Sequence, residues 1–481
     1  MKPNIPVTLC ASLALASCAH QKKETPLPNI VFILADDLGY GDLSCYGQQK
    51  FNTPNIDRLA QQGILFRQHY TGCTVSAPSR SCLITGLHTG HTPIRGNKAW
   101  QPEGQWPLPA ASFTLAEMLK AKGYATGAFG KWGLGYIDTE GDPNSQGFDE
   151  FFGYNCQSLA HNYYPDHLWR NHEKILIHEN DSGKTGGYSP DLINMEALDF
   201  IEKNKDRPFF MFYPTTIPHA ELFARKEYMD MFRGKFDPEK EFKGTDSGPD
   251  FRQGPYGSQP ESHAAFAGMV KELDDYVGQI LSKLAELGME KNTIVIFASD
   301  NGPHLEGGAD PDYFNSNGPF KGYKRDMYEG GIRTPLIVKW PGTVKPGSVS
   351  DHVSAFWDIM PTLAEVTGSP VPERIDGISF LPELLGKKQM KHEYLYWEFH
   401  EQGGKAGVRM GDWKAVKLNA DKGLNGPMEL YDLATDIGET SNVALSHPDI
   451  VKKMVEIMQR EHAPSDVFPF AFESPKSPQT P

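Results

Sequence analysis

The 481-residue chain has few cysteines, an excess of acidic over basic residues, and almost no long apolar runs. Its six cysteines form no Cys-x-x-Cys pair, which argues against a thiolate metal site or a redox motif. Beyond the N-terminal segment, no run approaches the ~20 apolar residues that a transmembrane helix needs. With 47 Lys and Arg against 61 Asp and Glu, the net charge is −14. This balance argues against nucleic acid as a partner and against electrostatic binding to membranes.

The N-terminal segment predicts an exported, lipid-anchored protein. Lys2 precedes an apolar stretch from Ile5 to Ala16, which is too short to cross a membrane and is typical of a signal peptide. The ending Leu15-Ala16-Ser17-Cys18 resembles a bacterial lipoprotein signal, so we expect residues 1–17 to be removed and Cys18 to be lipidated. An ordinary secretory signal with an incidental cysteine is the alternative. If Cys18 is lipidated, residues 18–28 would tether the protein to the bacterial envelope, at the outer membrane or in the periplasm, and the Cys18 lipid would be its one membrane contact.

The body of the chain alternates between buried strands and helices. Continuous apolar runs rich in β-branched and aromatic residues predict strands that are buried on both faces. Helices between such strands predict an α/β fold with a mostly parallel sheet. We expect strands at 29–35, 125–129, 208–213, 293–298 and 335–340, and helices at 55–62, 115–122, 192–203 and 263–287.

The pattern changes after residue 385. Short strands are predicted at 393–399, 407–418 and 428–432, followed by a helix at 448–461. We therefore predict a catalytic α/β domain over 29–385 and a smaller antiparallel subdomain over 386–481. The segment 232–260 is rich in Gly, Pro, Asp and Lys, which predicts a long surface loop.

Polar residues follow two of the predicted strands. Asp36-Asp37 ends the first strand, and Asp300-Asn301 follows the strand at 293–298. Open α/β sheets bind ligands at these ends of their strands. Carboxylate and amide oxygens suit Ca²⁺ or, less well, Mg²⁺, and the lack of a nearby histidine cluster argues against zinc. Either pair alone is more typical of a turn or a helix cap.

The most specific segment is Ser76-Ala77-Pro78-Ser79-Arg80-Ser81-Cys82-Leu83-Ile84-Thr85-Gly86. Without further context it would be a helix N-terminus capped by Ser76 or Ser79. It also resembles, without a mismatch, the sulfatase signature: Cys or Ser, any residue, Pro-Ser-Arg, two residues, Leu, one residue, Thr-Gly. Further motifs resemble that family in its order: Asp36-Asp37-Leu38-Gly39-Tyr40-Gly41-Asp42, Thr53-Pro54-Asn55-Ile56-Asp57-Arg58-Leu59, Gly130-Lys131-Trp132, Ile217-Pro218-His219, Ser299-Asp300-Asn301-Gly302, Gly322-Tyr323-Lys324 and Tyr328-Glu329-Gly330-Gly331-Ile332-Arg333-Thr334-Pro335.

The resemblance is to type I, formylglycine-dependent sulfatases of the serine type, in the alkaline-phosphatase-like superfamily. It implies a mixed, mostly parallel sheet between helices and a smaller C-terminal antiparallel subdomain. It also implies that a radical-SAM maturation enzyme converts Ser76 into formylglycine, whose hydrate attacks the sulfur of a sulfate ester. The family pattern assigns Ca²⁺ binding to Asp36, Asp37, Ser76, Asp300 and Asn301. It assigns stabilisation of the sulfate and the aldehyde hydrate to Arg80, Lys131 and Lys324, and protonation of the leaving alcohol to His219.

One position departs from the family pattern. The family commonly has histidine two residues after the lysine of its Gly-Lys-Trp motif, where this chain has Gly133. We expect His161 or His304 to fill that gap in part.

The substrate is expected to be a sulfated carbohydrate. Two segments, 160–170 and 394–401, are dense in aromatic and hydrogen-bonding residues, as sugar pockets are, although ordinary core composition explains them equally well. The narrowest expectation is exo-action on 4-sulfated galactose or N-acetylgalactosamine. The alternatives are a phosphodiesterase or phosphonate monoester hydrolase of the same fold, and a non-catalytic glycan-binding surface protein. Candidate substrate contacts are His161, His167, Arg170, His304, Glu398 and His400.

Overall fold

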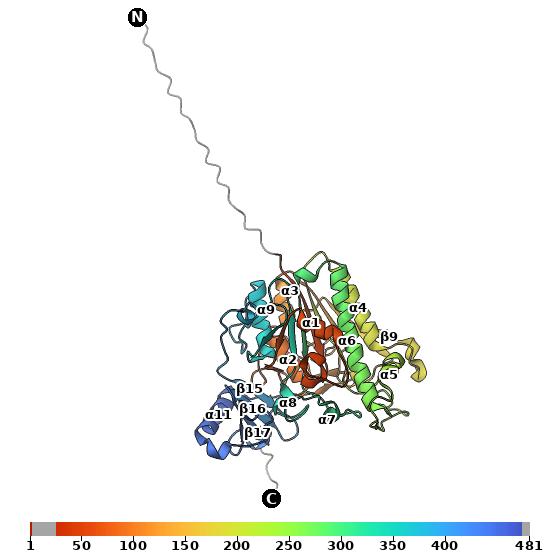
Figure 1. Cartoon of the computed structure of the whole chain (residues 1–481). Coiled ribbons are helices and arrows are strands. Elements are labelled where there is room, and N and C mark those ends of the chain that lie inside the picture. Colours follow the sequence, from red (N-terminus) through yellow and green to blue (C-terminus); the bar gives the residue numbers. More distant parts are fainter. Residues whose placement is uncertain (2–25, 474–481) are drawn as a thin grey trace.

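The computed structural model describes Met1 and residues 26–473 (Figure 1). The predicted signal peptide and the lipidation site Cys18 lie outside these residues. Within them, no helix combines the length and the apolarity needed to cross a membrane. The four cysteines of this part, Cys45, Cys73, Cys82 and Cys156, are all free thiols.

A ten-stranded mixed sheet forms the centre of the molecule, with the strand order β13-β2-β12-β11-β1-β10-β6-β7-β8-β9. The parallel strands lie in the middle, and β12 runs antiparallel to β11. Every residue of β1 is buried, which explains its unbroken apolar sequence. The strands are β1 (Asn29–Ala35), β2 (Ile64–Phe66), β6 (Ala125–Lys131), β7 (Glu150–Tyr154), β8 (His167–Arg170), β9 (Glu173–Leu176), β10 (Phe209–Pro214), β11 (Thr293–Ser299), β12 (Leu336–Lys339) and β13 (Ser348–Ser350).

Helices cover both faces of this sheet. Alternate residues of β1 point to opposite faces, so Val31 packs in a core with α4 and α6 while Phe32 packs in a second core with α2, α3 and α9. Figure 1 shows α4 and α6 on one side of the sheet and α3 and α9 on the other. The main helices are α1 (Pro54–Gln61), α2 (Ser76–Thr85), α3 (Leu115–Ala121), α4 (Ser189–Lys203), α6 (Ser262–Glu286) and α9 (Ile359–Thr367).

A smaller antiparallel sheet follows near the C-terminus. It contains β15 (Leu395–Phe399), β16 (Lys405–Met410), β17 (Trp413–Leu418) and β18 (Glu429–Asp432), in that order, and α11 (Pro448–Glu461) packs on it. The expectation of one strand over 407–418 is wrong. Gly411, with φ of 60°, makes a tight turn that separates β16 from β17.

Candidate active site

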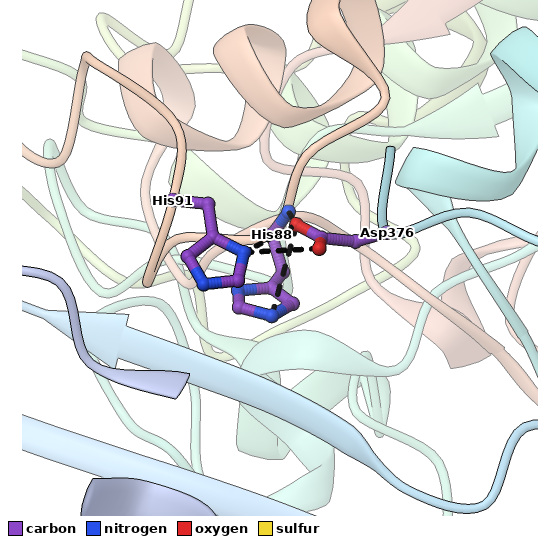
Figure 2. Close-up of side chains that lie close together, drawn as sticks. All are labelled: His88, His91 and Asp376. Atoms are coloured by element: carbon purple, nitrogen blue, oxygen red, sulfur yellow. Dashed lines mark hydrogen bonds and ion pairs between the residues drawn. The ribbon is translucent and has the colours of Figure 1, made fainter. Parts of the chain in front are cut away.

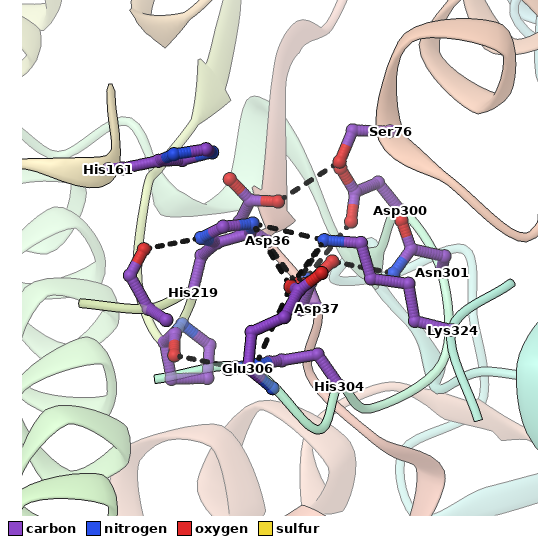
Figure 3. A network of polar contacts seen from close by, with 12 residues as sticks. Asp36, Asp37, Ser76, His161, His219, Asp300, Asn301, His304, Glu306 and Lys324 are labelled. Atoms are coloured by element: carbon purple, nitrogen blue, oxygen red, sulfur yellow. Dashed lines mark hydrogen bonds and ion pairs between the residues drawn. The ribbon is translucent and has the colours of Figure 1, made fainter. Parts of the chain in front are cut away.

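The site lies where several parallel strands end. Asp36 and Asp37 follow β1, Lys131 ends β6, His219 lies just beyond β10, and Asp300 follows β11. Because parallel strands present their carboxyl ends at one edge of a sheet, these residues from distant parts of the sequence meet there. Figure 3 shows most of the group.

Ser76 begins α2 and does not cap it. The N-cap residue is Val75, and no side chain caps the helix. Ser79 does not cap it either, since its Oγ donates to the carbonyl oxygen of Asp300 at 2.5 Å. The Ser76 Oγ instead faces the strand ends, 3.3 Å from Asp36 Oδ1 and 3.5 Å from Lys131 Nζ.

Two buried cations flank Ser76. Lys131 Nζ lies 2.6 Å from Asp36 Oδ2, and both side chains are buried. The Arg80 guanidinium contacts Asp300 Oδ2 through Nη2 at 2.9 Å and Nε at 3.1 Å. Burial raises the pKa of the Asp36 carboxyl to about 7, against the opposing charge of Lys131. The arrangement places two buried cations, each paired with a carboxylate, close to the start of α2, and such fixed cations can bind an anionic group.

Asp37 is the centre of a second set of contacts. Its carboxylate accepts hydrogen bonds from Asn301 Nδ2 at 2.6 Å and from Lys324 Nζ at 2.8 Å, and lies 3.3 Å from His219 Nε2. Burial disfavours its charged form, but Lys324, His304 and Lys131 together outweigh burial and lower the pKa of Asp37 to about 2. Lys324 also donates to His219 Nε2 at 3.0 Å and to Glu306 Oε2 at 3.1 Å.

The oxygen atoms at this edge fit a hard divalent cation. Asn301 Oδ1 is buried and has no hydrogen-bond partner among the described residues. Asp37 has φ of 61°, a left-handed conformation that costs a non-glycine residue on the order of 1 kcal/mol. Oxygens of Asp36 and Asp37 lie within 4.8 Å of each other, and Asp300 Oδ1 accepts from the Asp37 amide at 3.1 Å. An unpaired buried amide oxygen beside three carboxylates is the donor set that Ca²⁺ prefers.

Comparison with known proteins identifies the family to which a chain with this site belongs. Residues 28–369 match the profile of the Sulfatase family. The chain belongs to the sulfatase family. Residues 319–463 also match the profile described as N-sulphoglucosamine sulphohydrolase, C-terminal.

Curated relatives of this sulfatase cover most of its length. It is 34% identical to N-acetylgalactosamine-6-sulfatase of Mus musculus, over 93% of this chain and 82% of the relative. It is 30% identical to N-acetylgalactosamine-6-O-sulfatase of Bacteroides thetaiotaomicron, over 94% and 97% respectively. It is 31% identical to human arylsulfatase A, over 93% and 90%. The protein is therefore a sulfuric ester hydrolase.

Solved structures confirm the predicted fold of the sulfatase. The crystal structure of Ps i-CgsB aligns with a TM-score of 0.76 and 30% identity, over 91% of this chain and 94% of that chain. The phosphonate monoester hydrolase of Agrobacterium radiobacter aligns with a TM-score of 0.64 and 22% identity, over 90% and 96%. At that identity the second match shows the shared fold alone.

Two predicted substrate contacts of the sulfatase lie beside the catalytic candidates. The imidazole rings of His161, His219 and His304 stack, with centroid distances of 4.9 Å and 5.5 Å. Glu306, a residue that the sequence did not indicate, joins them through Lys324. The one feature of the sequence that could have indicated Glu306 is its position five residues after Asn301, in the same loop.

Four other predicted contacts have their hydrogen-bond and ion-pair partners outside this group. His167 Nε2 lies 2.8 Å from Glu103, and Arg170 Nη1 donates to Glu196 at 2.8 Å. Glu398 accepts from His400 at 2.7 Å within a buried network that joins the C-terminal subdomain, including His462, to Arg95 of the α/β domain.

Gly133, which stands where the family has histidine, has φ of 76°. A Cβ at this position would collide with the side-chain amide of Gln157. A side chain at residue 133 would therefore require the Gln157 side chain to move, and the positive φ would strain any residue other than glycine.

A second histidine cluster lies between the α2 loop and the C-terminal subdomain (Figure 2). His91 Nδ1 is 2.9 Å from Asp376 Oδ1, and His88 Nε2 is 3.4 Å from Glu461 Oε2. His88 Nδ1 accepts from the amide of Gly90 at 3.1 Å, so the ring proton is on Nε2 and faces Glu461. With that proton in place, His88 is a hydrogen-bond donor rather than a metal ligand, and the cluster links two parts of the sulfatase.

Proposed function

We propose that this sulfatase removes sulfate from a galactose-configured sugar at the end of a glycan, using Ca²⁺ and a formylglycine derived from Ser76. The observation that carries the proposal is the position of the Ser76 Oγ, 3.3 Å from Asp36 and 3.5 Å from Lys131, at the start of a helix with the complete signature. Formylglycine at residue 76 would supply, as its hydrate, a nucleophilic oxygen, and a bound Ca²⁺ would favour its deprotonation. Asp36, Asp37, Asp300 and Asn301 would hold the metal ion.

The side chains around Ser76 bind and orient the sulfate group. Lys131 and Arg80 are buried, so their charges act on an anion at Ser76 with little screening by water. Their partners Asp36 and Asp300 fix where each cation lies before substrate arrives. Such preorganised charge stabilises the negative charge that develops on sulfate oxygens during transfer.

The leaving alcohol needs a proton, and one is held nearby. His219 Nε2 accepts a hydrogen bond from Lys324 Nζ at 3.0 Å. Burial, with Lys324 beside it, lowers the pKa of His219 well below its usual value, so the ring is neutral. We propose that the Lys324 ammonium is the source of the proton: it passes a proton to His219 Nε2, and His219 Nε2 then donates that proton to the leaving oxygen, which leaves Lys324 as the neutral amine until water reprotonates it.

The relatives and the sequence support different sulfate positions on the same sugar. The curated relatives at 30–34% identity include N-acetylgalactosamine-6-sulfatases, while the sequence interpretation favours a 4-sulfate. The net charge of −14 supports recognition of one sulfate at a chain end rather than a grip along a polyanion.

A panel of sulfated monosaccharides tests the substrate. Converted enzyme should release sulfate from galactose or N-acetylgalactosamine sulfated at position 4 or 6. A preference for glucosamine 6-sulfate contradicts the proposed sugar. Mass analysis of the Ser76 peptide should show the loss of two hydrogens, which also tests the proposed role of a radical-SAM maturation enzyme.

A further inference from the structure

The three stacked imidazoles differ in which ring nitrogens are free. The rings of His161 and His219 are nearly parallel, at 8°, and those of His219 and His304 are at 17°. A neutral imidazole has one N–H donor and one acceptor nitrogen, and its partners show which is which.

Two of these rings use both nitrogens within the chain. His304 Nδ1 accepts from the amide of Glu306 at 3.2 Å, and its Nε2 faces a backbone carbonyl oxygen at 3.5 Å. His219 Nδ1 donates to a backbone carbonyl oxygen at 2.5 Å, and its Nε2 accepts from Lys324. Neither ring has an acceptor left for a substrate.

His161 has one. Its Nδ1 lies 2.9 Å from the carbonyl oxygen of Gly254, and since a carbonyl can only accept, the ring proton is on Nδ1. Its Nε2 therefore presents a lone pair, and it has no hydrogen-bond partner among residues 26–473. Burial lowers the pKa of His161 to about 4, so the ring remains a neutral acceptor at neutral pH.

The position of this ring is set by the chain on several sides. His219 stacks on it at 4.9 Å, and Tyr256 contacts it at a centroid distance of 5.0 Å. The backbone carbonyl of His161 accepts from the Glu221 amide at 3.1 Å. Figure 3 shows the ring above His219, directed toward the space that Ser76 also faces. Gly254 and Tyr256 belong to the long loop at 232–260, so that loop helps to build the site.

We propose that His161 Nε2 accepts a hydrogen bond from a hydroxyl group of the sugar that carries the sulfate ester. This inference rests on the proposed function, because it places His219 next to the leaving oxygen and hence His161 beside the part of the sugar that carries the nearest ring hydroxyl. His161 is then a specificity-determining residue. It favours sugars with a free hydroxyl near the sulfate ester, O3 for a 4-sulfate or O4 for a 6-sulfate, and disfavours those deoxygenated, methylated or sulfated there, because the acceptor would be left without a donor.

The test compares two variants and a control. His161→Phe keeps a flat ring on His219 and removes the acceptor, whereas His161→Gln offers an amide oxygen instead. His178→Phe is the control, since the His178 side chain is 73% exposed. Three substrates are used with converted enzyme: 4-nitrophenyl sulfate, which has no neighbouring hydroxyl, the 4- or 6-sulfated 4-nitrophenyl galactoside, and its deoxy analogue. The analogue is 3-deoxy for a 4-sulfate and 4-deoxy for a 6-sulfate.

His161→Phe should lower kcat/KM on the sulfated galactoside roughly tenfold, the worth of one neutral hydrogen bond, mainly through KM. Its activity on 4-nitrophenyl sulfate should fall by a clearly smaller factor, because that ester offers no hydroxyl to the lost acceptor. Wild type should lose the same roughly tenfold on the deoxy analogue, and the variant should lose nothing further. His161→Gln should regain part of the loss.

Equal losses on both ester types overturn the inference and leave the proposed function standing. The inference is also overturned, with the proposed function left standing, if wild type cleaves the deoxy analogue as efficiently as it cleaves the parent galactoside. This result does not depend on how well any variant folds. Absence of sulfate release from every substrate by converted wild type contradicts the proposed function and, with it, this role for His161.

Discussion

Replacing Asn301 with leucine should leave the metal-free sulfatase about as stable as wild type and remove most of its stabilisation by Ca²⁺. Asn301 Nδ2 donates to the Asp37 carboxylate at 2.6 Å, and a bond to a charged acceptor contributes about 1.5–3 kcal/mol. Its Oδ1 is buried without a partner in the described structure, which costs about 1–3 kcal/mol. Leucine removes both contributions, so without metal they offset each other. With free Ca²⁺ at 100 times its dissociation constant, wild type gains about 2.7 kcal/mol, and the variant loses most of this gain.

Urea unfolding measures both parts of this prediction, first with a chelator and then across a Ca²⁺ series. Asn425→Leu is the matched control, because Asn425 is exposed in the C-terminal subdomain. Equal Ca²⁺ stabilisation of the Asn301 variant and wild type would falsify the assignment of Asn301 as a ligand. Absence of any Ca²⁺ effect on wild type would refute the metal site itself.

Three further predictions concern the rest of the chain. Lys414→Met should lower the free energy of unfolding by about 3 kcal/mol, because it leaves the buried Glu329 carboxylate, 2.9 Å from Lys414 Nζ, without that partner; an unchanged urea midpoint contradicts this. The hydrogen bond to Asp376 raises the pKa of His91, so the protonated ring stabilises the folded state. At pH 5.5, where His91 is protonated, His91→Ala should lower the free energy of unfolding by about 1 kcal/mol. That cost should vanish as the pH rises through the folded-state pKa of His91, and a constant loss across pH argues against the ion pair. Cys18→Ala should move the protein from the membrane fraction to the soluble fraction and abolish palmitate labelling; continued labelling contradicts the lipidation site.

The central strands could be predicted from the sequence because they are buried on both faces. The limits of β1 agree with the predicted range, and those of β11 differ by one residue, since each is an unbroken apolar run between polar residues. The strands β2, β8 and β9 lie at or near the ends of the sheet and have only three or four residues each, too short for a recognisable apolar run. The antiparallel direction of β12 depends on the path of the chain around the sheet, which the local sequence does not indicate.

The site likewise contains residues that could be predicted from the sequence and residues that could not. Asp36, Asp37 and Asp300 could be brought together in prediction because parallel strands end at one edge of the sheet. The tautomer of His161 depends on the backbone carbonyl of Gly254, which lies in a loop distant in sequence, so the open nitrogen of His161 could not be read from the sequence. Glu398 and His400 lie in a segment with the composition of a sugar pocket, yet their partners are those of a buried network, because aromatic and charged residues also occur together in domain cores.

The central claim is that Ser76, held between Asp36 and Lys131, carries the group that cleaves sulfate esters. Its most direct test is sulfate and phosphate release from 4-nitrophenyl sulfate and 4-nitrophenyl phosphate by converted wild type and by Ser76→Ala. The account predicts rapid sulfate release and little phosphate release by wild type, and no sulfate release above background by Ser76→Ala. Undiminished sulfate release by Ser76→Ala, or faster hydrolysis of the phosphate ester by wild type, would contradict it.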